Sequence, residues 1–165
     1  MGKKRILVIG YGNPGRGDDG LGPALAARLE ALQIPALSVE SDYQLSIEHA
    51  ALAAEHDIVV FADAARDAED PFYFRPVFPA PARTLGSHSV TPAEVLSLAR
   101  SCFNASPQGF VLGMHARNLE RFEEGLSPAA QQAMEAALEH LREFIAGVSS
   151  AGCAGQDRVS PPTPS

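Results

Sequence analysis

Residues 5–20 read RILVIGYGNPGRGDDG and join an apolar run to a long glycine-rich loop. The run from Arg5 to Gly10 is continuously apolar after its first residue and ends in glycine, which is typical of a buried strand in a parallel sheet. Downstream of the loop, Pro23 suits the first turn of a helix, and leucines follow it at helical spacing. The chain is therefore predicted to open with a strand, a loop and a helix.

The alternation of strand and helix continues along the chain. Apolar runs predict further strands, loosely alternating residues predict an edge strand, and a Thr-Pro-Ala-Glu capping box marks the start of one of the helices. The predicted strands are 36–40, 58–62, 72–78 (edge) and 110–113, and the predicted helices are 46–55, 92–103 and 128–145. With right-handed crossovers, this order predicts an α/β fold, a three-layer α/β/α sandwich whose twisted sheet is mostly parallel with an antiparallel edge strand.

The length of 165 residues fits one domain. We predict a single domain over residues 1–146. Residues 147–165 are rich in Ser, Gly and Pro and lack an apolar stripe, so we predict a flexible C-terminal tail there.

Composition excludes several classes of protein. The net charge is −7 and the longest basic run is Lys3-Lys4-Arg5, so a nucleic-acid surface is not expected. No apolar stretch is long enough to span a membrane or to serve as a signal segment. The two cysteines have no metal spacing and no plausible disulfide role, which favours a reducing compartment. We therefore expect a cytoplasmic protein, and a monomer.

Three potential metal ligands fall where the fold predicts one crevice. Asp19 lies in the loop after the first strand, Asp63 ends the central strand 58–62, and His88 precedes the helix at 92–103. Open parallel sheets bind ligands outside the carboxyl ends of their strands. Two carboxylates and an imidazole there suit a divalent metal such as nickel or zinc.

Each of these residues also has an ordinary structural interpretation. Asp18 and Asp19 can be a solvated pair near a helix N-terminus, Asp63 can stabilise a turn, and His88 can be a loop histidine with a backbone partner. The shared location at one sheet edge is what favours the metal hypothesis. Among the other histidines, His115 follows a strand and could approach the crevice.

His49 and His56 belong to the second helix and its end, which we predict to lie away from that edge. The sequence contains no H-E-x-x-H and no G-x-S-x-G, so zinc protease and serine hydrolase chemistry have no support.

A dinucleotide-binding module is the first alternative. Residues 10–15, GYGNPG, match G-x-G-x-x-G after a strand, and Glu40 ends the second strand near where a ribose-binding acid would stand. However, Pro14 and the following glycines disfavour a helix start inside the motif, which phosphate binding requires. The adjacent Asp18 and Asp19 would also repel phosphate.

The chain resembles a known family at several motifs. The opening ILVIGYGN with DDGLGP (18–23), the stretch DYQL (42–45) and the strand end VFADA (60–64) are similar to the hydrogenase maturation proteases. Ser87-His88 before a Pro-capped helix and GLS (125–127) before the last helix extend the resemblance over roughly residues 5–145.

The resemblance implies an α/β/α endopeptidase that trims the C-terminus of a nickel-iron hydrogenase large-subunit precursor. It implies nickel contacts at Asp19, Asp63 and His88, with nickel carried by the substrate and no tightly bound cofactor. Asp19 stands where the family often has the longer Glu. The hydrolysing group stays open between the metal and a carboxylate. A second alternative is a non-catalytic, nickel-dependent hydrogenase chaperone.

Overall fold

The computed structural model describes residues 3–69, 71–81, 90–117, 119 and 124–154. Within these ranges five strands form one sheet in the order β2-β1-β3-β5-β4. The strands are β1 (Ile6–Tyr11), β2 (Leu37–Asp42), β3 (Ile58–Ala65), β4 (Phe72–Val77) and β5 (Gln108–His115). The pairs β1–β2, β1–β3 and β3–β5 are parallel, and β4 pairs antiparallel with β5 at the sheet edge. The predicted mixed α/β sheet with an antiparallel edge strand is confirmed.

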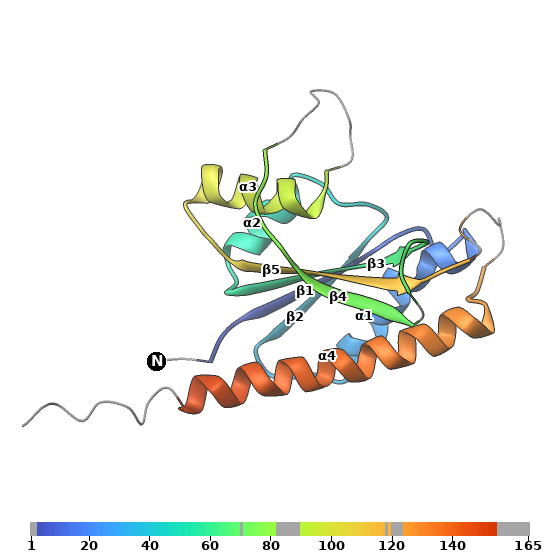
Figure 1. The fold of residues 1–165 in the computed structure, drawn as a ribbon. Helices are drawn as coiled ribbons and strands as arrows, with labels where there is room; N and C mark the ends of the chain where they lie inside the picture. Colours follow the sequence, from blue (N-terminus) through green and yellow to red (C-terminus); the bar gives the residue numbers. More distant parts are fainter. Residues whose placement is uncertain (1–2, 70, 82–89, 118, 120–123, 155–165) are drawn as a thin grey trace, which may run out of the picture.

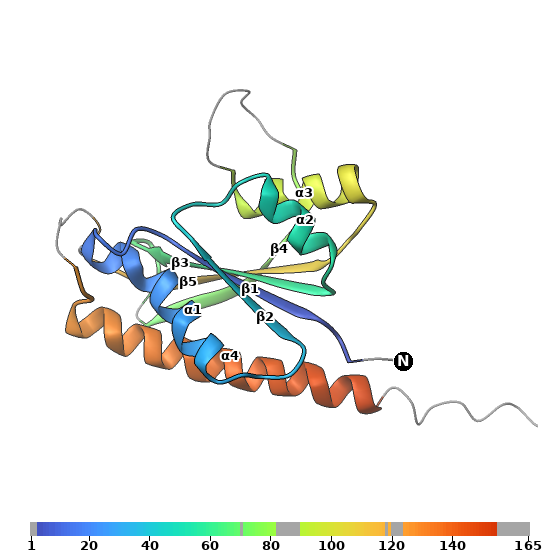
Figure 2. The same cartoon turned by 180° about the vertical axis from the view of Figure 1, so that it is seen from behind.

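Helices cover both faces of this sheet (Figures 1 and 2). The helices α1 (Leu21–Ala31) and α4 (Pro128–Ala154) lie on one face, while α2 (Glu48–Ala54) and α3 (Pro92–Phe103) lie on the other. A short 3-10 turn, η1 (Gly17–Gly20), precedes α1. The predicted three-layer arrangement is therefore present.

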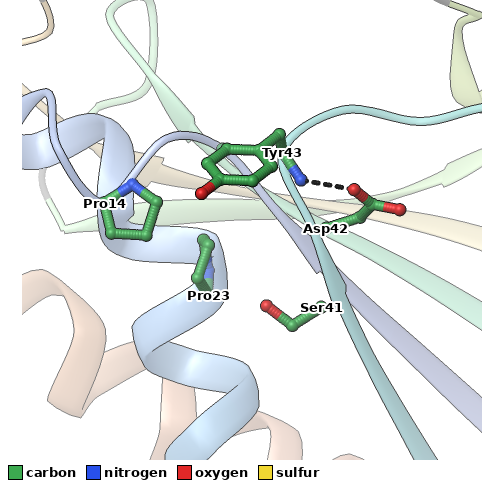
Figure 3. Close-up of a pocket in the computed structure, with 6 residues that line it drawn as sticks. Pro14, Pro23, Ser41, Asp42 and Tyr43 are labelled. Atoms are coloured by element: carbon green, nitrogen blue, oxygen red, sulfur yellow. Dashed lines mark hydrogen bonds between the residues drawn. The ribbon is translucent and has the colours of Figure 1, made fainter.

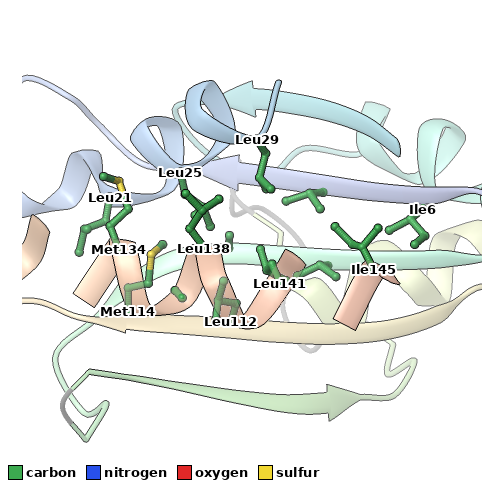
Figure 4. Close-up of a cluster of buried hydrophobic side chains, with 14 of the residues drawn as sticks. Ile6, Leu21, Leu25, Leu29, Leu112, Met114, Met134, Leu138, Leu141 and Ile145 are labelled. Carbon is green, nitrogen blue, oxygen red and sulfur yellow. The ribbon is translucent and has the colours of Figure 1, made fainter. Parts of the chain in front are cut away.

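Each face of the sheet has its own apolar cluster because alternate strand residues point to opposite sides. The α1/α4 face holds the larger cluster, in which leucines of α1 meet the apolar stripe of α4 (Figure 4). Phe61 and Val95 belong to the smaller cluster, between the sheet and α2/α3. The central strands β1 and β3 contribute to both clusters, which is why their sequences are continuously apolar.

Local sequence signals set several helix ends. The predicted capping box is present, with the Glu94 N–H donating to Thr91 Oγ1 at 3.2 Å and the Thr91 N–H donating to Glu94 Oε2 at 3.3 Å. Asn104 ends α3 in the left-handed conformation, with φ of 51°.

Helix α4 is longer than the sequence predicts. It continues to Ala154, past the predicted domain end at residue 146, and Val148 still contacts the larger cluster. Residues 147–154 are thus helical. Residues 155–165 lie outside the described residues, and the flexible tail stays a prediction there.

No helix in the described part of the chain is both long and apolar enough to cross a membrane.

Two glycines let α1 approach the end of β1. A Cβ on Gly22 would lie 2.3 Å from the Tyr11 carbonyl oxygen and 2.7 Å from that of Ala62. A Cβ on Gly10 would lie 2.1 Å from the Gly22 carbonyl oxygen. All of these neighbours are backbone atoms that cannot move aside singly, so the loop between β1 and α1 is held close to β3.

We expect Gly22→Ala to lower the free energy of unfolding by roughly 1–3 kcal/mol, because the added methyl group displaces α1 from the sheet. Urea unfolding measures the change. Gly147→Ala is the control, since it lies in α4 with open space around its Cβ position. There alanine should stabilise the protein by up to about 1 kcal/mol through helix propensity. Equal effects of the two substitutions would contradict the close approach of α1.

Candidate functional site

The candidate site lies at the topological switch point of the sheet. From β1 the chain passes through α1 to β2 on one side, whereas β3 pairs with β1 on the other side. The connections leaving the carboxyl ends of β1 and β3 therefore diverge, which leaves a crevice between them. Asp19, in the connection after β1, and Asp63, near the end of β3, both belong to this place.

The first loop holds Asp19 against its own backbone. The Asn13 N–H donates to Asp19 Oδ2 at 2.9 Å. Gly12 has φ of +143°, and a Cβ there would lie 2.0 Å from the Asp19 carbonyl oxygen. Only glycine accommodates this conformation and this close approach. The side chain of Asp19 is thus fixed from one side and remains partly exposed.

Asp63 is a perturbed carboxylate. Burial raises its pKa to about 7, the Ala64 N–H that donates to Oδ1 at 2.8 Å lowers it, and the negative charge of Asp19 raises it. The structure therefore brings two of the three predicted site residues together. A carboxyl group that titrates near neutral pH at a switch point is typical of a functional site.

The third predicted ligand, His88, lies outside the described residues. Among the residues that the structure does describe, no group of three His, Cys, Asp or Glu side chains is arranged to hold a metal ion. The ligand set Asp19, Asp63 and His88 therefore stays a prediction, for which the paired carboxylates supply two members.

Asp63 belongs to a row of side chains across the α2/α3 face of the sheet. Asp42 pairs with Tyr11, Asp63 pairs with Gly113, and Gly113 pairs with Tyr73. Since Gly10 pairs with Ala62, the next residue in register places Tyr11 beside Asp63. Burial raises the pKa of Tyr11, and the charge of Asp63 and the Tyr73 phenol raise it further. The carboxyl end of the sheet thus carries a continuous polar row.

Asp18 has a structural role that the sequence does not reveal. Its side chain is only 1% exposed. Oδ1 accepts the Ser127 N–H at 2.8 Å, and Oδ2 accepts the Ser127 hydroxyl at 2.9 Å and the Arg117 N–H at 3.4 Å. Ser127 Oγ in turn accepts the Ala130 N–H at 3.2 Å, in the first turn of α4. For Asp18, the interpretation of the two aspartates as a solvated pair is wrong.

His115 lies at the same end of the sheet as Asp63. It is the last residue of β5, and it pairs with Ala65. Its Nδ1 is 2.8 Å from the Ala68 carbonyl, to which it donates, and Nε2 accepts the Arg117 Nε–H at 3.3 Å. Both ring nitrogens are thus engaged within the protein.

His49 is misplaced by the sequence prediction. The Ser46 N–H donates to its Nδ1 at 2.9 Å, so the ring proton of the neutral form is on Nε2, which lies 3.7 Å from Asp42 Oδ2. His49 therefore contacts the carboxyl end of β2, because α2 starts at that edge. His56 lies away from the edge as predicted, with Nε2 3.0 Å from the Ser38 hydroxyl.

A pocket of about 260 Å³ opens beside the first loop. Gly12, Pro14, Pro23 and residues 41–43 line it. Figure 3 shows the Tyr43 ring extending toward Pro14, while the Asp42 carboxylate lies on the other side and accepts the Tyr43 N–H at 2.7 Å. Gly12 is common to this pocket and to the turn that holds Asp19, so the two features adjoin.

The loop geometry disfavours the dinucleotide alternative. Helix α1 begins at Leu21, and the residues after Gly15 form a turn and η1 instead of a helix N-terminus. The amides that would hold a pyrophosphate in that motif are therefore not presented at the glycines.

The fold is similar to that of solved hydrogenase maturation proteases. The [NiFe] hydrogenase maturation protease HycI from Thermococcus kodakarensis matches with a TM-score of 0.68 and 24% identity, over 88% of this chain and 94% of that chain. The hydrogenase maturating endopeptidase HybD from Escherichia coli matches with a TM-score of 0.66 and 25% identity, over 83% and 89%. A hydrogenase 2 maturation peptidase from a Thaumarchaeota archaeon matches with a TM-score of 0.63 and 22% identity, over 86% and 98%.

No protein-family model matches the chain, and a search of curated protein sequences finds no significant match. The similarity is thus visible mainly in the fold. These structures bear out the predicted resemblance to the hydrogenase maturation proteases at the level of the fold, and they are themselves named as proteases or endopeptidases.

We expect Asp18→Asn to lower the free energy of unfolding by about 2–4 kcal/mol. The asparagine amide would turn an N–H donor toward the N–H and O–H groups that donate to Asp18, so a buried donor would lose its acceptor. Ser127→Ala should cost about 1 kcal/mol through loss of the α4 cap. Urea unfolding of both single variants and the double variant measures their coupling. If the two effects simply add, Asp18 and Ser127 do not act as a unit.

Asp63→Asn should make the protein more stable at neutral pH. Unfolded Asp63 loses its proton near pH 4, whereas folded Asp63 keeps it until about pH 7. Wild-type stability therefore falls between these values, by up to about 4 kcal/mol, and the asparagine variant escapes this loss.

The difference between wild type and Asp63→Asn should thus be small near pH 4 and largest above pH 7, in urea unfolding with chelator present. Asp57→Asn is the control, since Asp57 precedes the same strand at its opposite end and accepts the Arg5 N–H. A difference that does not change with pH would exclude the perturbed carboxyl group.

Proposed function

We propose that this chain is an endopeptidase that removes the C-terminal extension of a nickel-loaded hydrogenase large-subunit precursor. The observation that carries the proposal is the meeting of Asp19 and Asp63 at the switch point of a maturation-protease fold. The names of the neighbouring structures support the reaction class. The carboxylate pair supports a site that receives a cation.

In this proposal nickel arrives as part of the substrate. Burial raises the pKa of Asp63, and repulsion by the nearby Asp19 carboxylate raises it further. A divalent cation between them would relieve that repulsion and favour the ionised form of Asp63. Asp19, Asp63 and His88 would complete the nickel coordination, as mixed oxygen and nitrogen ligands suit this ion. Only the nickel-loaded precursor would then bring the ion that keeps both Asp19 and Asp63 ionised.

Hydrolysis in this site needs a general base, and Asp63 suits that role. With the cation present Asp63 would be ionised at neutral pH and therefore able to accept a proton. Asp63 Oδ1 is held by the Ala64 N–H, which leaves Oδ2 to accept a proton from the attacking water. The proton would then pass to the leaving amine.

The proposal is tested by incubating the purified chain with nickel-loaded and nickel-free precursor and measuring the intact mass of the product. We expect loss of the C-terminal extension only from the loaded precursor. Asp19→Asn, Asp63→Asn and His88→Ala should each reduce the rate at least 100-fold, whereas Asp57→Asn should cleave normally. Cleavage of nickel-free precursor at the same rate would contradict the proposed requirement for nickel in the substrate.

Chelator treatment separates this mechanism from that of an ordinary metalloprotease. Treating the enzyme with chelator, and then removing the chelator, should leave cleavage of loaded precursor unchanged, because the metal comes with the substrate. An enzyme with its own catalytic zinc would lose activity. Binding of loaded precursor without cleavage would instead favour the non-catalytic chaperone.

A further inference from the structure

The row of side chains that contains Asp63 ends at a residue with no role so far, Tyr73. Asp63, Gly113 and Tyr73 occupy matching positions on three adjacent strands, β3, β5 and β4. Side chains in register on neighbouring strands project from the same face of a sheet. Asp63 and Tyr73 therefore stand on the same face, with Gly113 between them.

Gly113 leaves the space that the tyrosine ring fills. A Cβ at Gly113 would lie 2.3 Å from Tyr73 Cζ, 2.4 Å from Cε1 and 2.7 Å from the phenol oxygen. The end of the ring that carries the hydroxyl thus lies over Gly113 of β5, the strand between β4 and β3. Any side chain at position 113 would push the ring away, so glycine is a condition of this placement.

The ring also contacts Arg75. The Arg75 guanidinium carbon lies 3.9 Å from the Tyr73 ring centroid, which is a cation–π contact. The ring is therefore in contact with both β5 and Arg75. Burial raises the pKa of the Tyr73 phenol, the charge of Asp67 raises it, Arg75 lowers it, and the charge of Asp63 raises it. At neutral pH the phenol keeps its proton and remains a hydrogen-bond donor.

We propose that the Tyr73 hydroxyl donates a hydrogen bond to the scissile carbonyl oxygen of the precursor. This role rests on the proposed function. Water oxygen adds to the carbonyl carbon while Asp63 accepts the water proton, and the carbonyl oxygen becomes an oxyanion that accepts the Tyr73 O–H. When the C–N bond breaks, the oxyanion returns to a carbonyl and the amine leaves with the proton from Asp63. A fixed donor of this kind stabilises the transition state more than the ground state.

Tyr73→Phe tests this role, because it removes the hydroxyl and keeps the ring over Gly113 and beside Arg75. We expect kcat for nickel-loaded precursor to fall about 100-fold, with KM and melting temperature nearly unchanged. Ser101→Ala, which removes an exposed hydroxyl on α3, is the control and should cleave like the wild type. Gly113→Ala should reproduce the loss of kcat although the hydroxyl is still present.

The outcomes separate this inference from the proposed function. If the wild type cleaves loaded precursor and Tyr73→Phe cleaves it equally fast, the role of Tyr73 is refuted and the peptidase assignment stands. A rise in KM with unchanged kcat also refutes this role, because the hydroxyl would then stabilise the bound substrate and the transition state equally. If the wild type does not cleave loaded precursor at all, the proposed function fails and the role of Tyr73 fails with it.

Discussion

The buried carboxylate of Asp18 ties together two segments on which the site depends. It accepts hydrogen bonds from Ser127 at the start of α4 and from the backbone of Arg117 after β5, across separations of 109 and 99 residues. The first loop is thereby anchored to the end of the sheet and to the last helix at once. Because Asp19 is the next residue, its position follows directly from this anchor.

This anchoring explains how the fold tolerates an unfavourable pair of charges. Asp19 and Asp63 would move apart if the loop were free, since two nearby carboxylates repel. The glycines at 10, 12 and 22 and the hydrogen bonds of Asp18 hold the loop against β3, and the negative charge of Asp19 adds to the effect of burial in raising the pKa of Asp63. In the proposed function, a cation bound here would relieve this repulsion.

The parts of the fold set by local signals are predictable from the sequence. The apolar strands, the α3 capping box and the stripe of α4 follow from short-range patterns, and the rule for parallel sheets places Asp19 and Asp63 at the same end of the sheet. The buried role of Asp18 is not predictable in this way, because its partners are distant in the chain. The sequence misplaces His49 because α2 starts beside the carboxyl end of β2, so the first turn of the helix lies at the edge where no helix residue is expected.

Tyr73 illustrates a more general limit of that rule. The residues that follow a strand lie at the carboxyl edge of the sheet only when that strand is parallel to its neighbours. Strand β4 runs antiparallel to β5, so its beginning lies at that edge, and Tyr73 is the second residue of the strand. The antiparallel direction of this edge strand therefore places at the carboxyl edge a phenol that lies over Gly113 of β5, where a parallel strand would supply a loop. The register between β4 and β5 is then a functional constraint as well as a structural one, since a slip by one residue would turn Tyr73 to the opposite face.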